Sequence, residues 1–110
     1  MYIIIYDFGT SGLKTCLFEI DSRIRLAAST SATYGLYFSD DGGAEQDVEE
    51  WWAAICQTTR ELIRKSDFKP AGIQGVAFCT QMQGAVFVDD KGKSLRRPMN
   101  YLDQRGAKEY

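Results

Sequence analysis

Residues 1–18 constrain the fold most strongly. An unbroken β-branched and aromatic run at residues 2–6 is followed by Asp7, by the turn Gly9-Thr10-Ser11-Gly12 and by a second apolar run at residues 13–18. A run this short predicts a strand covered on both faces rather than a buried helix. Glycine permits positive φ, so the chain can reverse tightly between the two runs. The sequence therefore predicts a β-hairpin with a carboxylate at the end of its first strand.

The tip of this hairpin has the chemistry of a phosphate site. Backbone N–H groups in a tight glycine turn form an anion-binding concavity, to which Thr10 and Ser11 add hydroxyl donors. Lys14 can approach as a point charge. Phosphate would repel Asp7, but its carboxylate can hold Mg²⁺ through water, and Mg²⁺ bridges phosphate oxygens. Because short motifs recur by chance, a plain hairpin with a solvated Asp7 is the simpler interpretation of these residues alone.

Composition argues against several classes of protein. The 110 residues are 45% hydrophobic and 13% aromatic, which is enough for one domain with a core. A net charge of −2 gives no electrostatic reason to expect binding to nucleic acid or to an anionic membrane. No stretch approaches the about 18 apolar residues that span a bilayer. The first residues lack the features of a signal peptide, so we expect a cytoplasmic protein.

Cysteine and histidine usage restricts the chemistry further. Cys16, Cys56 and Cys79 lie in apolar segments without a C-x-x-C spacing, which predicts three reduced core thiols. The chain contains no histidine. Histidine-based acid–base catalysis, Ser-His-Asp or Cys-His triads and most zinc sites are therefore excluded from this chain.

A third strand and a helix are expected next. Residues 24–34 predict a strand that pairs back on the second, giving a three-stranded antiparallel meander, and residues 35–45 predict a loop. Asp47 is a good N-cap, and Glu50 three residues later completes a capping-box pattern. The apolar stripe of this helix includes both tryptophans, which we expect to be core anchors: Trp51 and Trp52.

After the helix, residues 72–79 predict a strand that runs parallel to the first by a crossover. Residues 80–84 follow at its carboxyl end, where ligands gather in open α/β sheets. Residues 85–95 predict a second hairpin and residues 98–102 an extended segment. Asp103 is expected to cap a final helix.

Four stretches occur in the order and at the spacing of one enzyme family. They are D-F-G-T-S-G-L-K at 7–14, E-Q-D-V-E-E-W-W at 45–52, G-V-A-F-C-T-Q-M-Q-G at 75–84 and N-Y-L-D-Q-R at 100–105. Together they resemble motifs in the amino-terminal part of the FGGY carbohydrate kinases, and most closely those of the xylulokinases. The resemblance covers essentially all 110 residues.

The resemblance implies an α/β fold of the ribonuclease-H-like, actin-like ATPase type. Residues 1–110 would be the amino-terminal part of the first domain, with the meander, crossover helix and parallel strand in one mixed sheet. In the family, two such domains close over MgATP and a sugar, and the γ-phosphate of ATP moves to a sugar hydroxyl. The catalytic aspartate base and the adenine pocket lie on later segments. The resemblance therefore implies a sugar-kinase fragment that is inactive alone.

Site roles also follow from the resemblance. Asp7 corresponds to the aspartate beside Mg²⁺ and the transferred phosphate. The phosphate-loop positions are Gly9, Thr10, Ser11 and Gly12, with Lys14 as a nearby basic position. The sugar-binding positions are Gln81, Met82, Gln83 and Tyr101. Asp103 and Arg105 correspond to a D-x-R pattern that we interpret as support for the sugar site.

Three positions differ from the family pattern. Thr80 replaces a glycine, Gln83 replaces a histidine and Tyr101 replaces a tryptophan. The amide of Gln83 can still donate to and accept from a sugar hydroxyl. The resemblance implies that the substrate is a pentulose or a related sugar or polyol, and the three differences affect which of these it is.

Two other functions use the same features. An actin-like ATP-binding assembly module would use the same phosphate hairpin without sugar chemistry. A non-catalytic interaction module would expose apolar surface and self-associate through it. Homodimerisation of the full-length protein is a further expectation.

Overall fold

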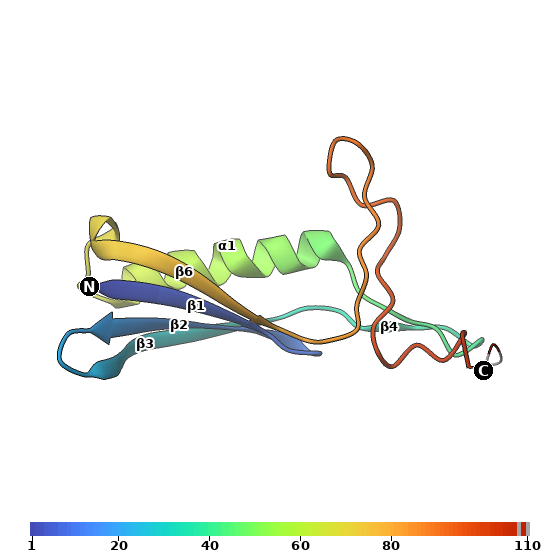
Figure 1. Cartoon of the computed structure of the whole chain (residues 1–110), viewed down its shortest axis with the longest axis horizontal. Helices are drawn as coiled ribbons and strands as arrows, with labels where there is room; N and C mark the ends of the chain where they lie inside the picture. Colours follow the sequence, from blue (N-terminus) through green and yellow to red (C-terminus); the bar gives the residue numbers. More distant parts are fainter. Residues whose placement is uncertain (108, 110) are drawn as a thin grey trace.

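The computed structural model describes residues 1–107 and 109. A four-stranded sheet carries one long helix on one face (Figure 1). Its strands, in the order β3-β2-β1-β6, are β3 (Ile24–Thr33), β2 (Gly12–Ile20), β1 (Tyr2–Phe8) and β6 (Ile73–Thr80). The first three form an antiparallel meander, and β6 runs parallel to β1. The predicted meander, crossover and parallel strand are confirmed.

The crossover helix α1 (Val48–Lys65) begins where the sequence predicts. The Asp47 carboxylate accepts a hydrogen bond from the backbone N–H of Glu49 at 2.9 Å, so Asp47 is the N-cap. The predicted capping box is wrong. The carboxylate of Glu50 instead accepts from the Gly35 N–H at 2.6 Å and from the Tyr37 hydroxyl. Glu50 therefore ties the segment after β3 to the first turn of the helix.

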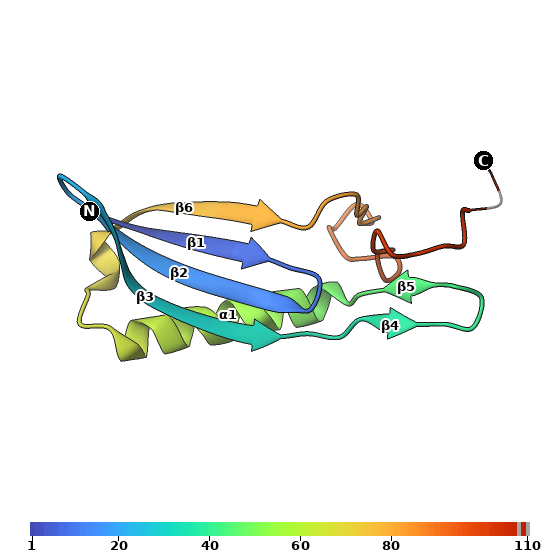
Figure 2. The same ribbon diagram turned by 90° about the horizontal axis from the view of Figure 1, so that it is seen from below.

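The segments outside the main sheet differ from the predictions in several places. The predicted loop at 35–45 contains a small hairpin, β4 (Tyr37–Phe38) and β5 (Ala44–Glu45), which projects beyond the sheet in Figure 2. A 3-10 turn, η1 (Pro70–Gly72), precedes β6. The hairpin expected at 85–95 is present but short: Val88 bridges Ser94, and backbone bonds join Leu95 to Phe87 and Asp89 to Lys93. Residues 105–107 form a turn and the described residues after Asp103 include no helix, while the rest of the predicted final helix lies outside the described residues.

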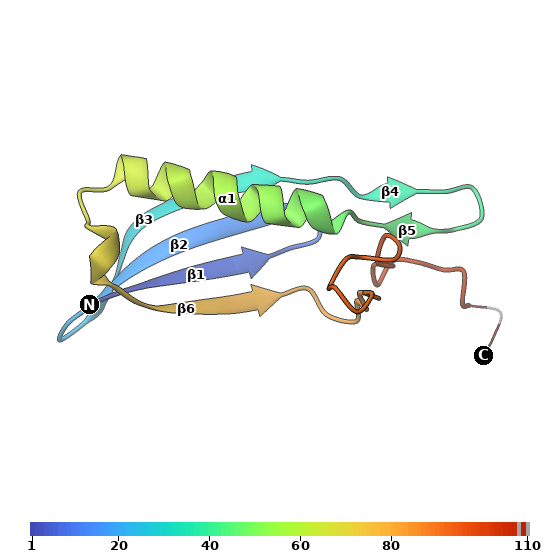
Figure 3. The ribbon, with the colours of Figure 1, turned by 90° about the horizontal axis from the view of Figure 1, so that it is seen from above.

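One face of the sheet carries the core. It consists of buried residues from β1, β2 and α1: Ile4, Tyr6, Leu13, Leu17, Ala54 and Leu62. Figure 3 shows α1 lying over β2 and β3, with β6 on the side of the sheet away from the helix. Val76 and Phe78 of β6 pair with core residues of β1 but remain 53% and 62% exposed. In β1 itself, Ile4 and Tyr6 are buried whereas Ile3 and Ile5 on the other face are only partly buried, so the prediction of a first strand covered on both faces holds for one face.

Two further core predictions are wrong. Trp52 is 62% exposed, and only Trp51 is partly buried, with its ring edge toward Tyr34. The three cysteines are free, but Cys79 is exposed and Cys16 and Cys56 are only partly buried. A helix one stripe wide cannot bury every apolar position on its surface or on a four-stranded sheet. Within the described part of the chain, no helix combines the length and apolarity needed to cross a membrane.

Threonine hydroxyls fasten the helix to the sheet inside this core. Thr15 and Thr58 are fully buried, and the Thr15 hydroxyl donates to the Thr58 hydroxyl at 2.7 Å. The Thr58 hydroxyl in turn donates to the Ala54 carbonyl at 2.7 Å. Thr30 of β3 donates to the Thr58 carbonyl at 3.0 Å. Each buried hydroxyl thus has a partner, and together they set where α1 lies across β2 and β3.

Replacing Thr58 by valine should lower the free energy of unfolding by about 1–3 kcal/mol, because the buried hydroxyl of Thr15 loses its acceptor. The double variant Thr15→Val/Thr58→Val should cost less than the sum of the single variants, since no hydroxyl is then stranded. Urea denaturation measures both effects. Thr33→Val, at an exposed position on β3, is the control. A loss for Thr58→Val as small as that of the control would contradict this account.

Candidate functional site

The parallel pairing of β1 with β6 creates the site. Phe8 pairs with Thr80 at the carboxyl ends of the two strands, and the Gln81 N–H extends the ladder to the Phe8 carbonyl at 2.8 Å. A cleft of about 390 Å³ opens at this edge. It is lined by Asp7, Phe8, Gly9, Thr10, Thr80, Gln81, Met82, Gln83 and Tyr101. Most of the residues singled out in the sequence therefore surround one cleft.

The hairpin tip carries free backbone donors, at Thr10 beside the cleft and at Ser11 beside a neighbouring depression. The turn is closed by a hydrogen bond from the Gly9 N–H to the Gly12 carbonyl at 2.9 Å. Within the described residues, the N–H groups of Thr10 and Ser11 have no partner. Unpaired N–H groups and a hydroxyl at a tight turn suit an anion such as phosphate.

The reason for glycine at the hairpin tip differs from the prediction. Neither Gly9 nor Gly12 has a positive φ, so the turn does not use the left-handed region. At Gly12 a Cβ atom would lie 2.5 Å from the backbone oxygen of Ala32. Glycine is needed there because β3 approaches closely, not because the turn is strained.

Tyr34 belongs to no motif in the sequence, but it contacts the hairpin tip. Its hydroxyl donates to the Gly9 carbonyl, so it pins the base of the hairpin tip to the end of β3. Burial and, to a lesser degree, the negative charge of Asp7 raise the pKa of Tyr34 to about 12. Tyr34 therefore stays a neutral hydrogen-bond donor at physiological pH.

Asp7 and Lys14 are cross-strand neighbours on β1 and β2, and both are exposed. Asp7 lines the cleft, whereas Ser11, Gly12 and Lys14 line a separate depression beside the end of β3. Among the described residues no three His, Cys, Asp or Glu side chains gather in one place. A single carboxylate fits Mg²⁺, which usually keeps several waters and takes its other ligands from substrate phosphates.

The loop after β6 presents two free side chains. Met82 is 74% exposed. Gln83 is also exposed and has a φ of 64°, a left-handed conformation that is uncommon for a residue other than glycine. The side chain of Gln81 is instead hydrogen-bonded to those of Gln46 and Asn100. Direct contact with a ligand in the cleft therefore falls mainly to Met82 and Gln83.

Tyr101 also lines the cleft. Its hydroxyl lies 3.1 Å from the Thr10 hydroxyl, and either oxygen can donate. Its ring is half exposed. An aromatic ring thus lines the cleft at the predicted position, and its hydroxyl also contacts the hairpin tip.

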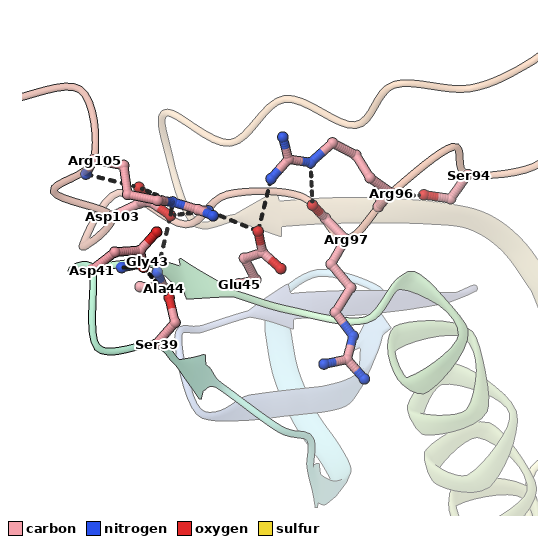
Figure 4. Close-up of polar contacts among 10 residues, drawn as sticks. All are labelled: Ser39, Asp41, Gly43, Ala44, Glu45, Ser94, Arg96, Arg97, Asp103 and Arg105. Atoms are coloured by element: carbon pink, nitrogen blue, oxygen red, sulfur yellow. Dashed lines mark hydrogen bonds and ion pairs between the residues drawn. The ribbon is translucent and has the colours of Figure 1, made fainter.

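Asp103 and Arg105 lie outside the cleft, in a cluster of ion pairs on β5 (Figure 4). Glu45 accepts from Arg96 and from Arg105, each at 2.7 Å, and Arg105 also contacts Asp103 at 2.5 Å. The Asp103 carboxylate accepts the Ala44 N–H at 2.9 Å. These bonds fasten the segment around Tyr101 to the hairpin of β4 and β5.

The charges of this cluster reinforce one another. The Arg105 guanidinium holds the pKa of Asp103 well below its usual range. Arg105, followed by Arg96, lowers the pKa of Glu45. The two carboxylates in turn raise the pKa of Arg105. All these groups therefore remain charged at neutral pH, which suits a structural role.

Comparison with known proteins identifies relatives along the whole chain. Residues 2–110 match the FGGY family of carbohydrate kinases, N-terminal domain. A xylulose kinase of Staphylococcus epidermidis is 35% identical over 101 residues, covering 92% of this chain and 20% of that protein. The chain thus spans about a fifth of the length of the curated relatives it matches.

Solved structures with the same fold include two kinases of Lactobacillus acidophilus. One is described as a gluconate kinase and the other as a ligand-bound xylulose kinase. Each has a TM-score of 0.84 and 26% identity, and the match covers 98% of this chain and 21% of theirs. The expected actin-like α/β fold, present here as a partial domain with a mixed sheet, is confirmed.

The raised pKa of Tyr34 predicts how stability depends on alkaline pH. The unfolded phenol ionises near its ordinary pKa of 10, whereas the folded one holds its proton to about 12. The contribution of Tyr34 to stability is thus complete below pH 10 and is lost as the pH rises through 12. The difference in absorbance at about 295 nm between the wild type and Tyr34→Phe should show a phenolate appearing near pH 12. A midpoint near 10 would contradict the proposed environment of Tyr34.

Proposed function

The chain belongs to the FGGY family of carbohydrate kinases, and we propose that it is the amino-terminal part of the first domain of an ATP-dependent sugar kinase of the xylulose kinase type. The enzyme would transfer the γ-phosphate of ATP to a hydroxyl of a pentulose or a related sugar or polyol. One observation carries the proposal: the hairpin tip and the loop after β6 line the same cleft. We place the protein in the cytoplasm, in keeping with its three free thiols.

The hairpin tip would bind the phosphates of ATP. The unpaired N–H groups of Thr10 and Ser11 and the Thr10 hydroxyl are donors for phosphate oxygens. Asp7 would hold Mg²⁺ through water, and the ion would neutralise charge on the transferred group. Lys14, next to Asp7 across the two strands, would add a positive charge from outside the cleft. Transfer of a phosphoryl group depends mostly on such positioning and charge neutralisation.

Met82, Gln83 and Tyr101 would bind the sugar. The Gln83 amide can both donate to and accept from hydroxyls, and Met82 offers an apolar surface to the sugar carbons. The tyrosine ring would form the far wall. Structural relatives described as a xylulose kinase and a gluconate kinase match this chain equally well, so the fold similarity favours neither substrate.

The described part of the chain lacks a free catalytic base in the cleft. Asp7 is the single carboxylate among the described residues that line it, and we assign Asp7 to Mg²⁺. Asp103 is engaged by Arg105 and by the Ala44 N–H. Deprotonating a sugar hydroxyl needs a base within hydrogen-bond reach. We therefore propose that this chain binds substrates but does not catalyse transfer alone.

An assembly or interaction module is the alternative function. The exposed Val76 and Phe78 on the uncovered part of β6 form an apolar surface that favours self-association. Light scattering on the purified chain measures that tendency. A thermal-shift screen of pentuloses and polyols against nucleotides separates the functions, because only a sugar kinase fragment should respond to the sugars.

The 110-residue chain should give no sugar-dependent ADP release in a coupled assay with MgATP and xylulose. The physical reason is the missing base, so adding more protein or raising the pH to 9 should not restore turnover. Sugar-dependent ADP release by the pure chain would refute the proposal that it binds substrates without catalysing transfer.

Asp7→Asn should weaken binding of magnesium tripolyphosphate by about 10- to 100-fold, the usual loss when an outer ligand of a metal is removed. Tripolyphosphate is chosen because the adenine pocket is expected on later segments. Isothermal titration calorimetry measures the affinity. Asp90→Asn, at an exposed position outside the cleft, is the matched control and should leave affinity unchanged. Equal affinities for both variants would remove Asp7 from the phosphate site.

A further inference from the structure

Three side-chain amides form a continuous hydrogen-bonded chain behind the cleft. The Gln46 Nε2 donates to the Thr10 carbonyl at 2.7 Å, and the Gln46 Oε1 accepts from the Gln81 Nε2. The Gln81 Oε1 accepts from the Asn100 Nδ2 at 2.6 Å. The Asn100 Oδ1 accepts from the Leu102 N–H at 3.0 Å. We call Gln46, Gln81 and Asn100 the amide relay.

The direction of this relay is determined by its two ends. A backbone carbonyl, here that of Thr10, can only accept, and a backbone N–H, here that of Leu102, can only donate. Each amide between them must therefore present its NH₂ toward Thr10 and its oxygen toward Leu102. Flipping any one amide would place two donors or two acceptors face to face. The relay consequently has one arrangement in which every partner is satisfied.

Burial makes that arrangement costly to disturb. Gln46 is 1% exposed and Asn100 is 7% exposed. Backbone bonds hold the same residues in place: the Gln46 N–H donates to the Pro98 carbonyl at 3.1 Å and the Asn100 N–H to the Ala44 carbonyl at 2.8 Å. Polar groups buried in this way lose more when unpaired than exposed ones do.

The relay joins the three segments that surround the cleft. Thr10 belongs to the hairpin tip, Gln81 begins the loop after β6, and Asn100 precedes Tyr101. Gln46 lies just before α1, so the helix start is the anchor of the relay. A movement of the hairpin tip cannot occur without breaking a bond in the relay or moving the loop after β6.

We propose that Gln46, Gln81 and Asn100 are positioning residues that set the separation between the phosphate hairpin and the sugar loop. Gln81 accordingly acts on the substrates through its neighbours, and its side chain is not a sugar ligand. This inference deepens the proposed function and depends on it for the identity of the two ligands. The coupling between the hairpin tip and the loop after β6 can be tested on this chain without knowing either ligand.

Hydrogen exchange followed by NMR on the 110-residue chain tests the coupling without any ligand. The reporters are two backbone N–H groups at opposite ends of the relay, those of Gly9 and Leu102. Gln46→Met removes the amide but keeps the length of the side chain, and it should speed exchange about tenfold at both reporters. Gln74→Met, at an exposed position on β6, is the control and should change neither.

The pattern of exchange decides between positioning and simple loss of stability. Equal acceleration at the reporters and at Leu17 in the core would mean that Gln46 only supports the fold, and acceleration at Gly9 alone would mean that no relay exists. Either result overturns the proposal. Gln81→Met should accelerate exchange at the same two reporters. It replaces Gln46→Met in the test if that variant does not fold.

The wild-type chain offers a test that needs no variant. The side-chain NH₂ protons of the three relay amides should exchange more slowly than those of the exposed Gln74. Exchange as fast as that of Gln74 would overturn the proposal. Slow exchange of the relay NH₂ protons in a chain that binds neither magnesium tripolyphosphate nor xylulose would support the coupling and contradict the proposed function. A failure of the proposed function is therefore distinguishable from a failure of this inference.

Discussion

The parallel pairing of β1 with β6 is the contact on which the site depends. Seven pairs, from Tyr2 with Ile73 to Phe8 with Thr80 and with a bulge after the first, bring segments separated by a whole helix to the same edge of the sheet. Because parallel strands point the same way, the residues that follow both strands leave at one edge. The hairpin tip and the loop after β6 face each other for that reason alone. The threonine contacts under α1 hold the crossover that makes this pairing possible.

Two clusters of polar side chains hold the segments around the cleft in place. The amide relay ties the hairpin tip to the start of α1, and the ion pairs of Glu45, Asp103 and Arg105 tie the last described segment to β5. Gln46, Asn100 and the side chain of Asp103 are buried, so their bonds are worth more than they would be in water, whereas Glu45 and Arg105 are partly exposed. The core under α1 includes Ile4 and Tyr6 of β1, but Val76 and Phe78 of β6 stay exposed, so apolar packing does not extend across β6. The loop after β6 is therefore held beside the hairpin tip mainly by these polar contacts.

The order of strands and the position of the helix could be predicted from the sequence, because they follow from local signals. The apolar run before Asp7 and the capping oxygen of Asp47 act within a few residues. Errors arose where a distant partner competes for the same group. The capping-box pattern predicts that Glu50 bonds within its own helix, but its carboxylate accepts from Gly35. Asp103 accepts the nearby Arg105 N–H, as a cap would, and also the distant Ala44 N–H. The structural roles of Tyr34 and Asn100 could not be predicted for the same reason, because their hydrogen-bond partners are distant in the sequence.

The central claim is that one cleft holds phosphate at the hairpin tip beside a sugar at the loop after β6. Paramagnetic broadening by Mn²⁺ bound to tripolyphosphate tests it most directly, because Mn²⁺ takes the same oxygen ligands as Mg²⁺ and acts only at short range. We expect the amide signals of Gly9, Thr10 and Met82 to broaden together, while those of Arg23 and Ile73 at the far end of the sheet stay sharp. Broadening that is centred elsewhere, or that reaches the hairpin tip but spares Met82, would contradict the claim.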